Sequence, residues 1–143
     1  MNRPLVLVVD DDPDILDAIC DILDAEGYRV ARARHGAEAL ERVAVELPSV
    51  ILLDLMMPRV DGFGVIEYLR AHPQATKPVV LVITAYADQK FKRVDPNIVA
   101  GVVRKPFEVA ELGSLVRLCA QAMGDVVNRP GRGSEQRDSV GVN

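Results

Sequence analysis

The 143-residue sequence has little of several residue types that would indicate a function by themselves. It has no tryptophan, only 4% aromatic residues, two cysteines and two histidines. Cys20 and Cys119 cannot build a disulfide framework, and we expect both to be inert thiols on apolar helix faces. His35 and His72 have no Cys or His neighbours at zinc-ligand spacing, so we expect surface histidines rather than metal ligands.

Net positive charge and long apolar runs are absent as well. Lys and Arg number 17 against 21 Asp and Glu, which gives a net charge of −4. A mildly acidic domain is a poor nucleic-acid binder, because phosphate contacts need a basic face. The longest apolar runs are too short to span a membrane, and residues 1–4 lack the shape of a signal peptide. We therefore expect a cytoplasmic protein with no direct nucleic-acid or membrane partner.

The sequence does contain a regular alternation of two patterns, within a chain that is 49% apolar. Continuous apolar runs rich in β-branched residues are typical of strands buried on both faces, and they alternate with amphipathic helical segments. Together they predict an α/β fold, a doubly wound parallel sheet with helices on both faces. The predicted strands are 5–9, 28–33, 50–53, 79–83 and 99–104; the predicted helices are 13 to a C-cap at 27, 36–46, 63–71, 88–94 and 108–123.

The last twenty residues differ in character from the rest of the chain. Residues 124–143 contain four Gly, one Pro, three Arg and three acidic residues, without an apolar period. Such a segment cannot bury enough apolar surface to offset the entropy of ordering it. We expect one domain over residues 1–123 and a disordered tail over residues 124–143.

Polar side chains stand where four of the predicted strands end. Asp10 and Asp11 follow the first strand, Asp54 follows the third, Thr84 the fourth and Lys105 the fifth. The carboxyl ends of parallel strands meet at one edge of the sheet, where open α/β sheets bind ligands. The sequence therefore places three carboxylates, one hydroxyl and one ammonium at the same edge.

Three carboxylates so close together need a counter-charge. Two unit charges 4 Å apart repel by about 4 kcal/mol at an effective dielectric of about 20. An all-oxygen ligand set suits Mg²⁺ rather than Zn²⁺. A divalent ion there would attract a phosphoryl group and make one carboxylate a feasible nucleophile, which would give an aspartyl phosphate. Thr84 and Lys105 could each bind one phosphoryl oxygen.

Four motifs together resemble a known family, the receiver domain of two-component response regulators, over about Leu5 to Met123. They match it in order and spacing: Val8-Val9-Asp10-Asp11-Asp12-Pro13, Leu52-Leu53-Asp54-Leu55-Met56-Met57-Pro58 with Asp61-Gly62, Ile83-Thr84-Ala85 and Lys105-Pro106-Phe107. The resemblance implies a flavodoxin-like sheet of five strands in the order 2-1-3-4-5. We interpret the chain as a stand-alone receiver without an output domain of its own.

The resemblance also implies a metal site with Asp54 as phosphoacceptor. Asp11 would bind Mg²⁺ directly, Asp10 largely through water, and Met56 through its backbone carbonyl. Met56 and Tyr86 would occupy positions that tune the lifetime of the aspartyl phosphate.

Thr84 and Lys105 would hold the phosphoryl group, and the bond between Lys105 and Pro106 is often cis in this family. The phosphoryl group would come from a histidine kinase or a phosphotransfer protein. The receiver would catalyse only its own phosphorylation and dephosphorylation, and would act by binding an unidentified downstream protein or by passing phosphoryl groups on. The resemblance also allows a homodimer.

One position departs from the family pattern. Receivers usually carry Tyr or Phe three residues before the conserved lysine, and this chain has Val102. Valine has neither the ring nor the hydroxyl of the usual switch residue. We expect any output signal to use the fourth helix and the loop after Thr84, including Tyr86 and Phe91.

Three alternatives remain open at this point. The first is a receiver-fold adaptor that works without phosphate. The second is a Mg²⁺-dependent phosphatase, although Asp54-Leu55-Met56 lacks the Asp-x-Asp motif of that class. The third is a flavodoxin-like FMN binder, although the acidic edge would repel the FMN phosphate and no tryptophan is present to stack on the ring.

Overall fold

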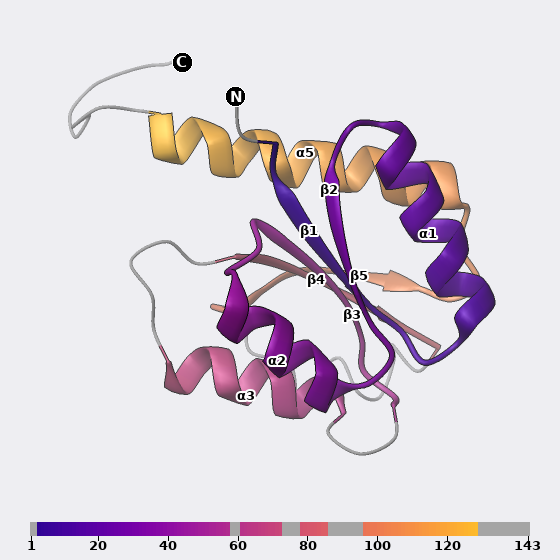
Figure 1. The fold of residues 1–143 in the computed structure, drawn as a ribbon, viewed down its shortest axis with the longest axis vertical. Coiled ribbons are helices and arrows are strands. Elements are labelled where there is room, and N and C mark those ends of the chain that lie inside the picture. Colours follow the sequence, from indigo (N-terminus) through magenta and orange to yellow (C-terminus); the bar gives the residue numbers. More distant parts are fainter. Residues whose placement is uncertain (1–2, 58–60, 73–77, 86–95, 129–143) are drawn as a thin grey trace.

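The fold is a parallel sheet covered by helices on both faces (Figure 1). It is seen in a computed structural model that describes residues 3–57, 61–72, 78–85 and 96–128. The elements are β1 Leu5–Val9, α1 Pro13–Ala25, β2 Arg29–Ala33, α2 Gly36–Val45, β3 Val50–Asp54, α3 Gly62–Ala71, β4 Val79–Thr84, β5 Val99–Arg104 and α5 Val109–Asn128. The helix predicted at 88–94 lies outside the described residues.

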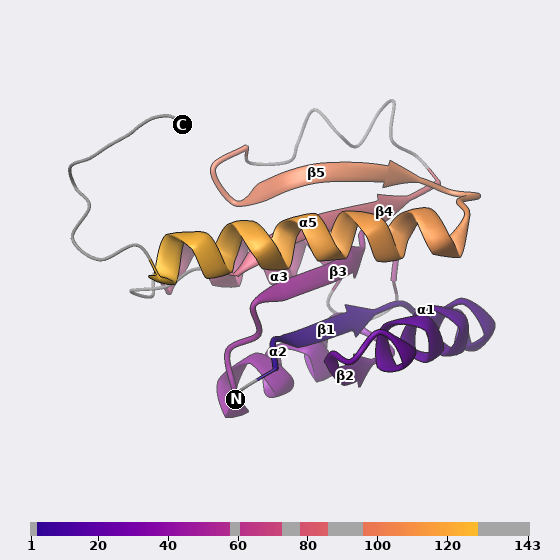
Figure 2. The same cartoon turned by 90° about the horizontal axis from the view of Figure 1, so that it is seen from above.

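All five strands pair in parallel, in the order β2-β1-β3-β4-β5. This is the 2-1-3-4-5 order that the resemblance implied. The arrowheads in Figure 2 point toward the same end of the sheet, where α1 begins. The carboxyl ends of the strands therefore share one edge, as the sequence predicted.

Two apolar clusters hold the layers together, one on each face of the sheet. Val6 and Val8 of β1 pack with Leu16 of α1 and Val116 of α5 on one face. The alternate residues of β1, including Leu7, pack with the cluster that contains α2 and α3 on the other face. Burying one such side chain contributes about 1.5–3 kcal/mol. The continuous apolar runs thus arise because both faces of the strands are covered.

The first helix begins where the sequence placed it and ends one residue earlier, with its C-terminal cap at Glu26 instead of Gly27. The side chain of Asp12 caps α1, since its Oδ1 accepts a hydrogen bond from the Asp14 amide at 2.9 Å, and Pro13 is the first helical residue. Glu26 is the C-terminal cap, and Gly27 follows it with φ of +95°, a conformation that glycine adopts at little cost. The β1–α1 connection is therefore short and firmly anchored.

The last helix runs five residues beyond its predicted end, to Asn128 instead of Met123. The predicted end of this helix is therefore wrong, whereas the division into a domain over residues 1–123 and a tail over residues 124–143 stays a prediction. Gly124 lowers helix propensity by about 1 kcal/mol relative to alanine, but it removes no backbone hydrogen bond. Residues 129–143, the rest of the predicted tail, lie outside the described part of the chain.

Several other helix and strand boundaries differ from the predicted ones by one residue. Within the described ranges, no helix is long and apolar enough to cross a membrane. Tyr28, predicted to begin β2, precedes it and packs into the cluster under α1 and α5.

Candidate functional site

The structure brings the three predicted carboxylates together at the carboxyl edge of the sheet. Asp10 follows β1, Asp54 ends β3, and one oxygen atom from each of Asp10, Asp11 and Asp54 lies within 4.8 Å of the others. Asp10 is 0% exposed and Asp54 is 3% exposed, whereas Asp11 is exposed. The cluster thus consists of two buried carboxylates and one exposed carboxylate, so a ligand can reach it from solvent.

Asp10 is fixed by the chain on either side of it. Its amide donates to the Ala33 carbonyl at 3.1 Å, and its Oδ1 accepts from the Asp12 amide at 2.9 Å. Its Oδ2 lies 3.1 Å from Lys105 Nζ, yet accepts no hydrogen bond of good geometry from any residue that the structure describes. A buried carboxylate oxygen in that position is an available ligand.

Asp54 is held through both of its oxygens. Oδ1 accepts from the Met56 amide at 3.1 Å, and Oδ2 accepts from Lys105 Nζ at 3.2 Å. Burial raises the pKa of Asp54 to about 6, and repulsion from Asp10 adds to the shift, while Lys105 and the Met56 amide oppose it. The carboxyl group is therefore mostly ionised at neutral pH, but at an energetic cost that a nearby cation would relieve.

Lys105 bridges the two buried carboxylates. Burial disfavours its charged form, but the attraction of Asp54 and Asp10 outweighs that cost and raises the pKa of Lys105. Its amide donates to the Thr84 carbonyl at 3.0 Å, which ties the end of β5 to the end of β4. The Lys105–Pro106 peptide bond is cis, as the resemblance led us to expect.

Thr84 and Met56 flank this centre. Thr84 is the last residue of β4 and is 0% exposed, which places a buried hydroxyl at the same edge as the carboxylates. Met56 follows β3 in the connection to α3 and is 42% exposed. All six predicted site residues therefore lie at or directly after the carboxyl ends of β1, β3, β4 and β5.

Gly62 is a residue whose role the sequence did not reveal. A Cβ atom at this position would lie 2.6 Å from the Asp54 carbonyl oxygen and 2.6 Å from Leu55 Cα. The Gly62 amide donates to the Leu55 carbonyl at 3.0 Å, so the start of α3 is in direct contact with the chain that follows β3. The sequence signal available for Gly62 was the Asp61-Gly62 pair in the motif. That pair does not reveal the close approach of Gly62 to residues 54 and 55, because this approach depends on the fold.

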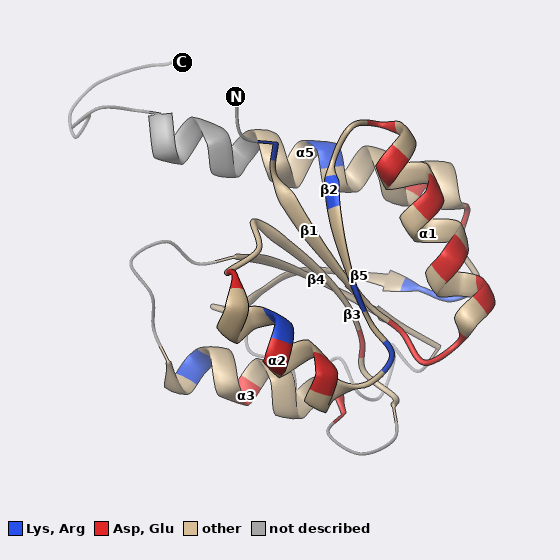
Figure 3. Ribbon diagram, in the orientation of Figure 1, with Lys and Arg blue, Asp and Glu red and all other residues tan. Residues whose placement is uncertain are grey.

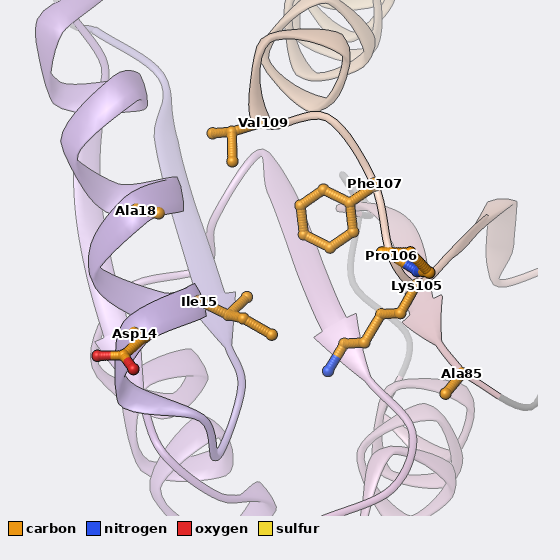
Figure 4. Close-up of a pocket in the computed structure, with 8 residues that line it drawn as sticks. All are labelled: Asp14, Ile15, Ala18, Ala85, Lys105, Pro106, Phe107 and Val109. Carbon is orange, nitrogen blue, oxygen red and sulfur yellow. The ribbon is translucent and has the colours of Figure 1, made fainter.

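An apolar pocket of about 460 Å³ opens beside the carboxylates. Figure 4 shows Ile15 of α1 facing Phe107 across it, with the Lys105 ammonium at its rim. The other lining residues are Asp14, Ala18, Ala85, Pro106 and Val109. Any protein that reaches the carboxylates from this side must pass over an apolar surface.

The donor set fits a hard divalent cation. Oxygen ligands from three carboxylates, one of them carrying a buried oxygen without a hydrogen bond, match what Mg²⁺ accepts. Lys105 supplies only one positive charge to the three carboxylates, so the centre retains an excess of negative charge. Neither histidine nor cysteine belongs to the cluster.

The structure describes three further residues for which the sequence analysis made a prediction: Val102, Cys20 and Cys119. Val102 pairs with Val82 and packs against the α2–α3 core cluster, and no aromatic side chain replaces the usual switch ring at that position. Cys20 and Cys119 both pack into the cluster under α1 and α5, where burial raises the pKa of each thiol. Tyr86 and Phe91 lie outside the described residues.

The two histidines have local structural contacts. His35 is partly buried and caps α2, where its Nδ1 accepts from the Glu38 amide at 3.1 Å, a role that the sequence did not predict. His72 is exposed and stacks on Tyr68 with ring centroids 4.1 Å apart.

Comparison with known proteins agrees with this geometry. A family model described as the response regulator receiver domain matches residues 6–117. The chain is 38% identical over 117 residues to the DNA-binding dual master transcriptional regulator RpaA of Synechocystis, covering 80% of this chain and 48% of that protein. It is 37% identical over 112 residues to hybrid signal transduction histidine kinase D of Dictyostelium discoideum, covering 78% of this chain and 7% of that protein. The chain thus spans half or less of these relatives.

Solved structures show the same likeness. The receiver domain of the Francisella response regulator 1452 is 29% identical with a TM-score of 0.74, covering 84% of this chain and 98% of that one. A CheY-like receiver domain protein from Methanospirillum hungatei, 24% identical, shares the fold with a TM-score of 0.79 over 87% of this chain and 99% of that one. With the matched family model over most of its length and the acidic centre at the edge of its sheet, the chain belongs to the response regulator receiver domains of two-component signalling.

Proposed function

We propose that the protein is a phosphorylation-dependent switch or relay that accepts a phosphoryl group on Asp54 from a histidine kinase or a phosphotransfer protein. The observation that carries this proposal is the position of Asp54. It is buried beside Asp10, hydrogen-bonded to Lys105, and open to ligands through the neighbouring exposed Asp11. A carboxylate used only for structure would not need two further carboxylates beside it.

The site has the parts that phosphoryl transfer needs. Asp10, Asp11, Asp54 and the backbone carbonyl of Met56 would hold Mg²⁺, which would supply the positive charge that offsets the incoming phosphoryl oxygens. An oxygen of Asp54 attacks the phosphorus atom of a phosphohistidine. The new O–P bond forms as the P–N bond breaks, and the imidazole of the donor leaves and takes up a proton.

Two residues of the chain then bind the transferred group. Lys105 Nζ already lies 3.2 Å from Asp54 Oδ2, so only a small movement is needed for it to pair with a phosphoryl oxygen instead. Thr84, whose hydroxyl is buried at the same edge, would donate to a second oxygen. The resulting change of charge at the ends of β3, β4 and β5 is the signal, which we propose is read by a cytoplasmic protein that binds this edge.

The experiment that tests the proposal is intact-mass analysis after incubation with acetyl phosphate and Mg²⁺. We expect one phosphoryl adduct in the wild type, none in Asp54→Asn and none when EDTA is present. Asp21→Asn is the matched control, because it makes the same change on an exposed face of α1 away from the cluster. An adduct that persists in Asp54→Asn would refute the assignment. No adduct together with no Mg²⁺ binding would favour the phosphate-independent adaptor.

A further inference from the structure

A second pocket, of about 340 Å³, lies at the carboxyl end of the edge strand β2 and is lined largely by charged residues. It receives one arginine from each of three segments: Arg32 from β2, Arg34 from the β2–α2 connection and Arg42 from α2. Its other walls are Pro13, Leu16 and Glu38. Figure 3 shows basic residues on β2 and α2, whereas the exposed face of α1 is strongly acidic. We call this pocket the arginine pocket.

The carboxylates near the arginine pocket do not saturate its guanidinium groups. Glu38 Oε1 accepts from the backbone amide of Arg34 at 2.7 Å. The Glu38 oxygens lie 3.9 Å from Arg34 Nε and 3.8 Å from Arg42 Nη2, beyond hydrogen-bond distance. Asp17 accepts a hydrogen bond from Arg32. Three guanidinium groups thus share the pocket with one carboxylate, that of Glu38, while Asp17 and Asp21 of α1 act on Arg32 from outside its lining.

Hydrogen-bond donors are also left over. Each guanidinium carries several N–H donors and no acceptor. Among the described residues, Arg32 donates to Asp17, Arg42 donates through Nε to the Arg32 carbonyl at 3.1 Å, and the guanidinium of Arg34 makes no hydrogen bond. Arginines from three segments therefore line one pocket, and Glu38, the carboxylate among its lining residues, does not satisfy all of their N–H donors.

Charged residues on an edge strand usually serve to prevent pairing with another sheet. That role accounts for Arg32, which belongs to β2. It does not account for Arg34 and Arg42, which come from a connection and a helix and converge on the same pocket. Planar guanidinium forks are the groups that proteins use to bind phosphate.

We propose that the arginine pocket binds the phosphate group of a small phosphorylated molecule. Its volume falls within the range of small-molecule sites, and Pro13 and Leu16 leave an apolar wall for the rest of the ligand. The side chains of the three arginines are 48%, 74% and 52% exposed, so binding is weak and salt-dependent. This site does not depend on Asp54 and would exist whether or not that residue is phosphorylated.

The test is a titration of the ¹⁵N-labelled protein with inorganic pyrophosphate, followed by NMR at low ionic strength with EDTA. Without a divalent ion the carboxylate cluster repels the anion, so binding there does not contribute. We expect saturable shifts in the amides of Leu16, Arg34 and Glu38. In the double variant Arg34→Gln/Arg42→Gln we expect the dissociation constant to rise at least about tenfold, because two charge-assisted donors are lost.

The double variant Arg70→Gln/Arg117→Gln is the matched control. It removes the same charge from α3 and α5, outside the arginine pocket, so its dissociation constant should change less than about twofold. Asp54→Asn should leave the affinity unchanged, which separates this proposal from the one for Asp54. Absence of saturable shifts, or equal losses in the two double variants, would overturn the arginine pocket as a phosphate site.

Discussion

Replacing Gly62 with alanine should slow phosphorylation as well as lower stability, because the added Cβ displaces the segment that carries Asp54. The added Cβ would lie 2.6 Å from the Asp54 carbonyl oxygen, 2.6 Å from Leu55 Cα and 2.9 Å from Leu55 Cδ2. Ordinary carbon contacts are about 3.5–4.0 Å, so α3 and the chain after β3 must separate by roughly 1 Å. Two of the three atoms are backbone atoms, which cannot rotate away.

The size of the effect follows from that displacement. Overpacking costs about 1–3 kcal/mol of unfolding free energy. A misplacement of about 1 Å near reacting groups can cost a factor of about 100 in rate. The displaced segment carries Asp54 and Met56, so we expect the rate of adduct formation with acetyl phosphate to fall between about tenfold and about a hundredfold.

Gly27→Ala is the matched control for that experiment. Gly27 has φ of +95°, and a Cβ added there would have no atom within 4 Å, so alanine strains the backbone without touching the site. It should cost about 1 kcal/mol in urea unfolding and leave the phosphorylation rate within about twofold. If Gly62→Ala lowered stability but kept the wild-type phosphorylation rate, the idea that Gly62 positions the Asp54 segment would be refuted.

Further predictions concern the charges of the site. Because burial raises the pKa of Asp54 to about 6, the folded state binds more protons than the unfolded state between about pH 4 and 6, and stability from this group falls as pH rises through that window. In the absence of metal, Asp54→Asn should therefore raise the unfolding free energy at pH 7 by up to about 3 kcal/mol and lose that gain below pH 4, as urea titrations at each pH would show. Lys105→Met should move the ¹³C-detected titration midpoint of the Asp54 carboxyl above its wild-type value, and an unchanged midpoint would contradict the bridging role of Lys105. Mg²⁺ at 100 times its dissociation constant should stabilise the protein by about 2.7 kcal/mol in thermal melts, and Asp11→Asn should abolish most of that gain.

Much of the fold could be predicted because its signals are local. The strands 5–9 and 99–104 were located to the residue by apolar runs. Asp12 and Pro13 mark the start of α1 through capping rules that act within one turn. The predicted end of α5 was wrong because a glycine weakens a helix without stopping it.

The candidate site was predictable only as a set of residues. Parallel strands that end in polar residues must bring those residues to one edge, so the proximity of Asp10, Asp11 and Asp54 followed from the topology. The raised pKa of Asp54, the buried oxygen of Asp10 without a hydrogen bond, and the tight approach of Gly62 depend on packing between distant segments. No local pattern carries that information.

The Lys105 side chain contacts both the carboxylate cluster and the apolar pocket, and this affects when a bound partner protein would be released. Its ammonium holds Asp10 and Asp54, while its stem and the next two residues, Pro106 and Phe107, form a wall of the apolar pocket that faces α1. If Asp54 is phosphorylated as proposed and the Lys105 ammonium moves from a carboxylate to a phosphoryl oxygen, the same side chain would move that wall. A partner protein bound against this wall would therefore respond directly when Lys105 changes its ion-pair partner. Release of that protein would then be linked to phosphoryl transfer.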